Sequence, residues 1–85
     1  MTRLLLKYRS GEEIKKGDRV LFHREPGEID FVACDPEDHD PGVRWHMQEF
    51  GGGVGVRDAI AGLTFISADQ IDEYEDLEFV GRASG

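Results

Sequence analysis

Apolar and polar residues alternate along most of this 85-residue chain, in short runs divided by glycine, proline and acidic turn residues. A period of two is typical of strands that bury one face, and short runs between turn signals favour antiparallel pairing. The pattern therefore predicts an all-β, mainly antiparallel domain. The six predicted strands cover residues 2–8, 18–23, 28–33, 54–57, 63–66 and 77–80.

The strongest pair of alternating runs lies on either side of Glu25-Pro26-Gly27. Proline presets a turn φ and glycine accepts a positive φ, so this tripeptide predicts the turn of an antiparallel hairpin. The alternation also assigns one face of each strand to the core. The predicted core residues are Val20, Phe22, Ile29, Phe31, Val54, Val56, Leu63, Phe65, Leu77 and Phe79.

One segment has helical spacing instead. Asp40 followed by Pro41 is typical of an N-cap and first helical position, and Gly51 stands where a helix-ending glycine is expected. The apolar residues between them at helical spacing are Val43, Met47 and Phe50. We therefore predict a helix over residues 41–50, and a further helical turn within the acidic segment 68–76.

The length of the chain limits what it can form. Eighty-five residues are enough for one domain with a modest core, and too few for a deep enclosed pocket. Six short strands with one helical insert at about 41–50 predict a small SH3-like β-barrel covering residues 1–85. The single cysteine, Cys34, can form no internal disulfide, and the apolar run near the start is too short for a signal peptide. Both observations favour a cytoplasmic protein.

Charge is distributed unevenly. The chain carries a net charge of −8, yet residues 1–24 hold seven basic against three acidic residues, and residues 25–85 hold three against fifteen. An acidic body repels phosphate backbones and attracts basic surfaces, so the charge favours a protein partner over nucleic acid. The alternative interpretation is that the acidic residues only keep a small protein in solution.

No constellation of residues predicts an enzyme, a cofactor or a metal. His39 and His46 are seven positions apart, which does not match the spacing of zinc ligands. The acidic loop around His39 lacks the central glycine and terminal glutamate of a calcium loop. The glycines of residues 51–55 precede a valine-rich strand, whereas a dinucleotide loop precedes a helix. We expect a non-catalytic protein without a cofactor.

Two aromatic residues are candidate anchors for a partner. If the apolar stripe of helix 41–50 faces the barrel, Trp45 lies on the outer side of the helix, where tryptophan favours interfaces. Alternatively, the helix rotates and buries Trp45 as a plug. Tyr74, among acidic neighbours, either grips a basic partner or covers the barrel end. The predicted partner-binding residues are Trp45, Asp72, Glu73, Tyr74, Glu75 and Asp76.

Five segments carry a recognisable pattern: Tyr8–Gly11, Ile14–Val20, Pro26–Val32, Trp45–Val54 and Glu75–Val80. Within them, Gly17-Asp18-x-Val20 and Gly27-x-Ile29 resemble the opening hairpin of SH3-like small barrels. The whole pattern resembles a group of small bacterial proteins, some of which accompany polymorphic or contact-delivered toxins as immunity proteins. The resemblance implies one common fold and an immunity role, and it brings no catalytic residues.

Two functions remain open at this point. The first is a non-catalytic protein-binding module, in the form of an immunity protein that covers a bacterial toxin with its acidic surface. The second is a small-barrel adaptor that binds nucleic acid or a ribosomal or transcription partner through Lys15, Lys16 and Arg19. Phosphate binding by this short basic stripe would oppose the field of the acidic body, so we favour the protein partner.

Overall fold

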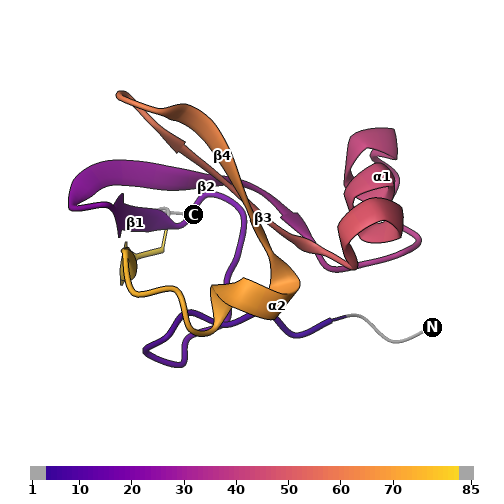
Figure 1. Ribbon diagram of the computed structural model, residues 1–85, viewed down its shortest axis with the longest axis horizontal. Helices are drawn as coiled ribbons and strands as arrows, with labels where there is room; N and C mark the ends of the chain where they lie inside the picture. Colours follow the sequence, from indigo (N-terminus) through magenta and orange to yellow (C-terminus); the bar gives the residue numbers. More distant parts are fainter. Residues whose placement is uncertain (1–3, 83–85) are drawn as a thin grey trace.

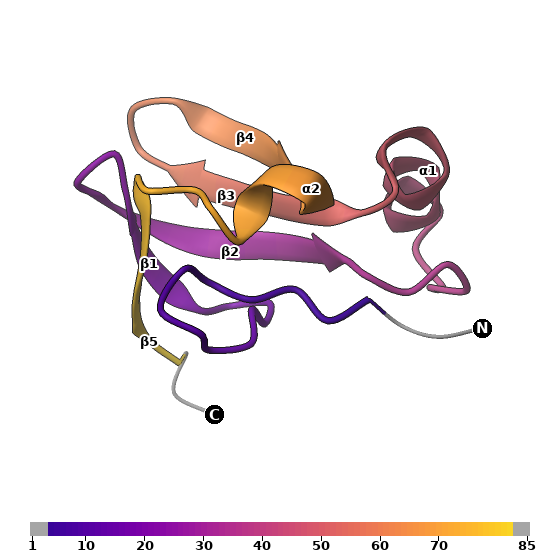
Figure 2. The ribbon, with the colours of Figure 1, turned by 60° about the horizontal axis from the view of Figure 1, so that its bottom comes forward.

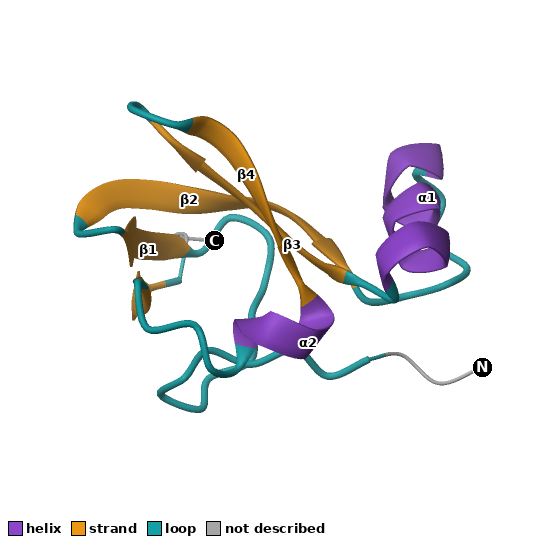
Figure 3. Cartoon of the chain, in the orientation of Figure 1, coloured by secondary structure: helices purple, strands orange, loops and turns teal. Residues whose placement is uncertain are grey.

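The alternating runs form five antiparallel strands in the computed structural model, which describes residues 4–82 (Figures 1 and 3). The strands are β1 (Arg19–Phe22), β2 (Glu25–Ala33), β3 (Gly53–Asp58), β4 (Gly62–Ser67) and β5 (Leu77–Gly81). They form one sheet in the order β4-β3-β2-β1-β5, so β4 and β5 are its edges. The predicted antiparallel β-fold is confirmed in this form. The sheet is not closed, so closure into an SH3-like barrel is not confirmed.

The predicted first strand, residues 2–8, is wrong as far as the structure describes it, and residues 1–3 lie outside the described range. Only one isolated antiparallel bridge forms here, between Lys7 and Glu13. The chain turns at Gly11, where φ is 106°, a value that favours glycine. This segment runs past the sheet in Figure 2, and it packs Leu6 and Ile14 into the core. The alternating apolar residues of this segment are thus buried although the segment forms no strand of the sheet.

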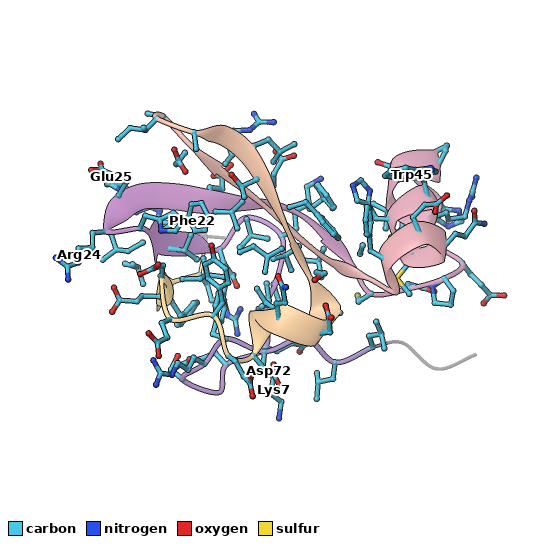
Figure 4. All side chains as sticks on the ribbon, viewed as in Figure 1. Lys7, Phe22, Arg24, Glu25, Trp45 and Asp72 are labelled. Carbon is cyan, nitrogen blue, oxygen red and sulfur yellow. The ribbon has the colours of Figure 1, made fainter. Side chains whose placement is uncertain are left out.

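The turn of the first hairpin begins two residues earlier than predicted. Phe22 pairs with Glu25, which leaves His23 and Arg24 as a two-residue turn with φ values of 51° and 67°. Positive φ at both central positions is typical of the turn whose twist matches the flanking strands. Pro26 instead lies within β2, opposite Leu21. Figure 4 shows Arg24 at this projecting end of the hairpin.

The predicted helical insert is confirmed. The helix α1 (Pro41–Phe50) begins at Asp40, whose carboxylate accepts a hydrogen bond from the Gly42 amide at 2.8 Å, and ends at Gly51 with a φ of 71°. A second short helix, α2 (Ala68–Ile71), confirms the predicted helical turn. Figure 2 places α1 at one end of the sheet, beside β2 and β3. None of the helices within residues 4–82 is long and apolar enough to span a membrane.

One face of the sheet carries most of the predicted core. The predicted core residues that are buried are Val20, Phe22, Ile29, Val54, Val56 and Leu77, and Phe79 packs against them half-buried. Tyr8, Ile66 and Ile71 join the same cluster, although they were not predicted to. The N-terminal segment and α2 thus cover the face that a closed barrel would have enclosed.

Three predicted core residues, Phe31, Leu63 and Phe65, lie on the opposite face, so that part of the prediction is wrong. In β2, Ile29 pairs with Val56 but Phe31 pairs with the next residue, Gly55, which marks a β-bulge. The extra residue turns Phe31 away from the face of Ile29, because side chains change face at every position. In β4, Ile66 takes the core position and Leu63 is 53% exposed.

The Gly-Asp pair that begins β1 has a structural role. Asp18 is 1% exposed, and its Oδ2 accepts hydrogen bonds from the Tyr8 hydroxyl at 2.6 Å and the Lys15 amide at 2.9 Å. Arg82 donates to the same oxygen at 2.7 Å and also to the Glu13 carbonyl. Burial, together with the Asp18 carboxylate, raises the pKa of Tyr8 well above its ordinary value. This network joins both ends of the described chain to the sheet.

Candidate functional site

Five rings from three elements form a connected cluster on the face opposite the core. They are Phe31 of β2, Phe65 of β4, and Trp45, His46 and Phe50 of α1. We call this cluster the aromatic face. The ring centroids of neighbouring members lie between 4.7 and 6.2 Å apart, within the range of favourable aromatic pairs. These ring contacts, together with the buried side chain of Val43, hold the helix on the sheet.

Two glycines of β3 allow the rings to lie close against the backbone. Gly55 pairs with Phe31 on one side and with Phe65 on the other. A Cβ atom at Gly55 would lie 2.2 Å from the Phe31 ring, and one at Gly53 would lie 2.5 Å from the Phe65 ring. Because both side chains are absent, the two phenylalanine rings stack across β3 with their planes 12° apart. The glycine spacing is thus a packing requirement of the aromatic face.

His46 joins the helix to the two phenylalanines of the sheet. Its ring lies 4.9 Å from Phe31 and 4.7 Å from Phe65, measured between centroids. Its Nδ1 is 2.7 Å from the carbonyl oxygen of Gly42, one helical turn earlier, so this nitrogen donates in that bond. Both the backbone bond and the ring contacts fix the orientation of His46, which makes this part of the cluster rigid.

The outer part of the aromatic face is open to solvent. Trp45 is 50% exposed and Phe50 is 49% exposed, and their rings meet edge to face at 5.6 Å. The alternative in which Trp45 plugs a barrel is therefore wrong, because Val43 and not Trp45 is the buried residue of α1. Tryptophan is among the residue types most enriched at binding hot spots, so Trp45 is the leading candidate for an anchor.

The predicted acidic segment lies elsewhere on the molecule. Figure 4 shows Trp45 on α1 at one end and Asp72 well away from it, beyond α2. Tyr74 is half-buried, stacks on Phe22 at 5.9 Å, and packs against the core. The structure therefore does not bring Trp45 together with residues 72–76, and Tyr74 serves in part as a cover for the core.

The acidic side chains of this segment differ in their contacts. Glu75 is 3.7 Å from Arg9, and the Asp76 carboxylate is 3.2 Å from Nδ1 of His23. Asp72 and Glu73 are exposed, and Glu73 helps to line a shallow pocket together with Asp69. All four acidic side chains are thus exposed to an approaching partner, and within residues 4–82 Asp72 and Glu73 are the two that form no ion pair.

The basic stripe of the alternative function is interrupted by carboxylates. Lys15 and Lys16 line a pocket of about 520 Å³ whose walls also include Asp35, Asp38 and Asp40. Arg19 stands opposite Glu28 in the β1–β2 register. These acidic neighbours lower the local positive potential, because opposite charges at short range offset one another.

The candidate metal ligands of the sequence do not come together in the structure. Within residues 4–82, no group of three or more His, Cys, Asp or Glu side chains is placed to hold a metal ion. The two histidines considered as metal ligands lie in different surroundings. His46 is packed among the rings of the aromatic face, whereas His39 is exposed in the loop before α1. Cys34 is buried at 7% exposure.

Sequence reasoning identified Trp45 but missed Phe31, Phe50 and Phe65 as members of the same surface. The spacing Gly53-x-Gly55 in a strand was the available signal, since alternate glycines leave room on one face for large side chains from neighbouring strands. Comparison of the chain with protein-family models, with curated proteins and with solved structures finds no match.

Proposed function

We propose that this chain is a non-catalytic protein-binding module that holds a basic partner protein through the aromatic face. The observation that carries the proposal is the pair of half-exposed rings, Trp45 and Phe50, fixed edge to face on a rigid base of further rings. Aromatic side chains add large contact area at low cost in conformational entropy, because they have few rotatable bonds. A rigid aromatic base reduces that cost further.

Charge supports a basic partner. The chain carries −8 overall, and Asp72, which stands for the exposed acidic segment in Figure 4, lies apart from Trp45 of the aromatic face. In this proposal the aromatic face contributes the short-range binding energy, and the acidic surface increases the rate of encounter. The two groups of predicted residues therefore act in different steps of one association, although they do not form one contiguous site.

An immunity protein is the form of this function that the family resemblance favours. Neutralising a toxin needs tight binding over its active site and no chemistry of its own. A nuclease would be a suitable target class, because its substrate-binding surface is basic and an acidic protein can occupy it. Partners of this kind are the first to test.

Nucleic acid remains the alternative ligand. Lys15, Lys16 and Arg19 would have to bind phosphate while carboxylates line the same pocket or the same strand pair. Aromatic residues that stack on bases usually lie inside a positively charged groove, whereas the pocket beside Phe31 and His46 places Lys16 together with Asp30 and Asp40. A protein partner is the better match to these charges.

The test is a kinetic comparison on a partner captured from the native host and then purified. Trp45→Ala should raise the dissociation rate by about thirtyfold or more, equivalent to about 2 kcal/mol, because a hot-spot ring is lost. Val80→Ala is the matched control, since Val80 is an exposed apolar residue on β5 with 59% exposure. It should leave both rates unchanged.

A second pair of variants separates steering from contact. Charge reversal at Asp72 and Glu73 should slow association several-fold at low salt and leave dissociation nearly unchanged, with the difference disappearing as ionic strength rises. Glu25→Lys, at the distant hairpin turn shown in Figure 4, is the control for charge alone. Capture of nucleic acid through Lys15 and Lys16, or an unchanged dissociation rate for Trp45→Ala, would contradict the proposal.

A further inference from the structure

The edge strand β4 has an uncovered backbone. It pairs with β3 on one side only, and within residues 4–82 no further backbone hydrogen bond reaches its outer side between Gly62 and Ser67. Figures 1 and 2 show β4 as the outermost strand, with neither helix lying across its free edge. Such an edge offers a row of free N–H and C=O groups to any strand that can approach.

The opposite edge, β5, is protected in the ways that natural edge strands usually are. Glu78 places a charge on this strand, and Arg9 and Ser10 of the N-terminal segment line a pocket against it. Arg82 directly follows the strand, and its guanidinium lies over the Phe79 ring at 4.9 Å. Charged side chains and flanking segments hinder pairing with a second chain. The two edges therefore differ in charge, because charged side chains lie on and beside β5 whereas β4 itself carries none.

The open edge is also free of charge. Residues 59–68 form the longest run in the chain without a charged residue, although one third of all residues are charged. Ile60 and Leu63 within it are 75% and 53% exposed. If a basic partner paired with this edge, we would expect acidic residues on β4 to attract it. The strand carries none. An uncharged edge is instead what two copies of an acidic chain require if they are to approach each other.

We infer that β4 pairs antiparallel with β4 of a second copy, about a two-fold axis at Thr64, to form a continuous ten-stranded sheet. In this register Leu63 of each copy lies opposite Phe65 of the other, on the side of the aromatic face. Thr64 lies opposite its own counterpart, and Gly62 lies opposite Ile66. No charged pair is opposed within the strands, and the contact is isologous, so the assembly closes as a dimer.

The dimer has a consequence for the aromatic face. A two-fold axis perpendicular to the sheet keeps the same side of both copies together, so the two α1 helices stand on one side of the joined sheet. Leu63 and Phe65 of both copies then form a continuous apolar floor between the two Trp45–Phe50 pairs. The hairpin tip that carries Ile60 comes level with the start of α2 in the second copy, where part of its exposed surface is covered.

Sedimentation velocity of the purified chain tests the inference directly. We expect a monomer–dimer equilibrium visible at about 0.1 mM, since an interface built on six strand residues is small. Raising the salt concentration should strengthen dimerisation several-fold, because it screens the repulsion between two bodies of charge −8. Binding of a basic partner should weaken with salt, so this inference and the proposed function can fail independently.

A charged variant at the edge gives the complementary result. Leu63→Lys should remove dimerisation, because two lysines would face apolar rings across the two-fold axis. Leu63 is more than half exposed, so the monomer should stay folded. Val80→Lys at the edge β5 is the matched control and should leave the dimer intact. A dimer that persists in Leu63→Lys, or a loss of dimerisation in Val80→Lys alone, would overturn the inference.

Cross-linking fixes the register. Cα atoms directly opposite in an antiparallel pair are about 4.5–5.5 Å apart, within the range that a disulfide spans. Thr64→Cys should therefore form a covalent dimer under mild oxidation, whereas the parent chain, whose Cys34 is buried, should not. A chain that stays monomeric at about 1 mM would overturn the inference. Exchange protection of the β4 amides that appears only when a different protein is added would assign the edge to that protein instead.

Discussion

The two faces of the central strands are built from different side chains and are closed to different degrees. On the core face, Val54 and Val56 of β3 are fully buried in a cluster that combines aliphatic side chains with the rings of Tyr8 and Phe22. On the aromatic face, the same strand contributes Gly53 and Gly55, and rings from β2, β4 and α1 fill the space above them. The outermost of those rings, Trp45 and Phe50, are half exposed.

The difference separates stability from recognition. A face covered by the N-terminal segment and α2 removes its apolar surface from water and stabilises the fold. A face that holds exposed rings rigidly contributes less to folding, and its remaining surface is available to a partner. Substitutions on the two faces should therefore change different measured quantities, and the size of each effect tests how complete the separation is.

The largest effect is expected on the core face. Phe22→Ala removes a ring that is 2% exposed and should lower the free energy of unfolding by about 3–5 kcal/mol, measured by urea denaturation. Phe50→Ala, on the aromatic face, is the matched substitution and should cost about 1 kcal/mol or less, because half of its ring is already in water. Equal losses for the two variants would mean that the faces are not distinct.

An added methyl group at Gly55 sharpens the comparison. Gly55→Ala should destabilise the fold by about 1–3 kcal/mol, since its Cβ would lie 2.2 Å from the Phe31 ring. In a Phe31→Ala background the cost should shrink, and a double-mutant cycle measures that coupling. Gly81→Ala is the control, because no atom lies within 4 Å of its Cβ position. A cost at Gly55 that is independent of Phe31 would rule out this packing explanation.

High pH should weaken the network that ties the chain ends to the core face. The pKa of Tyr8 is raised in the folded state, so above about pH 10 the unfolded chain loses a proton that the folded chain retains. The free energy of unfolding should then fall by up to about 1.4 kcal/mol per pH unit from this group. Tyr8→Phe should lack that component, so its stability should approach that of the parent as pH rises. If the free energies of unfolding of the parent and of Tyr8→Phe fell in parallel with pH, ionisation of Tyr8 would be excluded as the cause.

The smallest effect is expected at the hairpin turn, outside both faces. Arg24 has a φ of 67°, which disfavours every residue with a side chain. Arg24→Gly should raise the free energy of unfolding by less than about 1 kcal/mol, because relief of the backbone strain is partly offset by the entropy of glycine. His23→Gly is the contrasting change. It should gain less, since it removes the contacts of His23 with Tyr74 and Asp76.

Local sequence signals predicted the elements well where a residue type has a strong structural preference, such as a helix cap or a buried strand position. Asp40-Pro41 and Gly51 gave the bounds of α1, and the alternation of Val54 and Val56 placed both residues in the core. The face of Phe31 could not be predicted in the same way. A single bulged residue in β2 reverses every later side chain, and no residue type marks that bulge.

The candidate site was predicted only in part for a related reason. Trp45 was identified because tryptophan at a helix surface is rare, but the sequence assigned the three phenylalanines of the aromatic face to the core side of the helix and strands. Segment 72–76 was grouped with Trp45 by composition alone, and the structure separates the two. Contacts between distant segments, such as Phe50 with Phe65 at 5.0 Å, depend on packing that no local pattern records.

The most direct test of the central claim uses the only tryptophan of the chain as its own reporter. Trp45 fluorescence should be strongly quenched by acrylamide in the free protein, because half of the side chain is exposed. Addition of the purified partner should shift the emission to shorter wavelength and reduce the quenching constant several-fold, since the aromatic face is then covered. Saturating binding of the partner with unchanged emission and unchanged quenching would contradict the account.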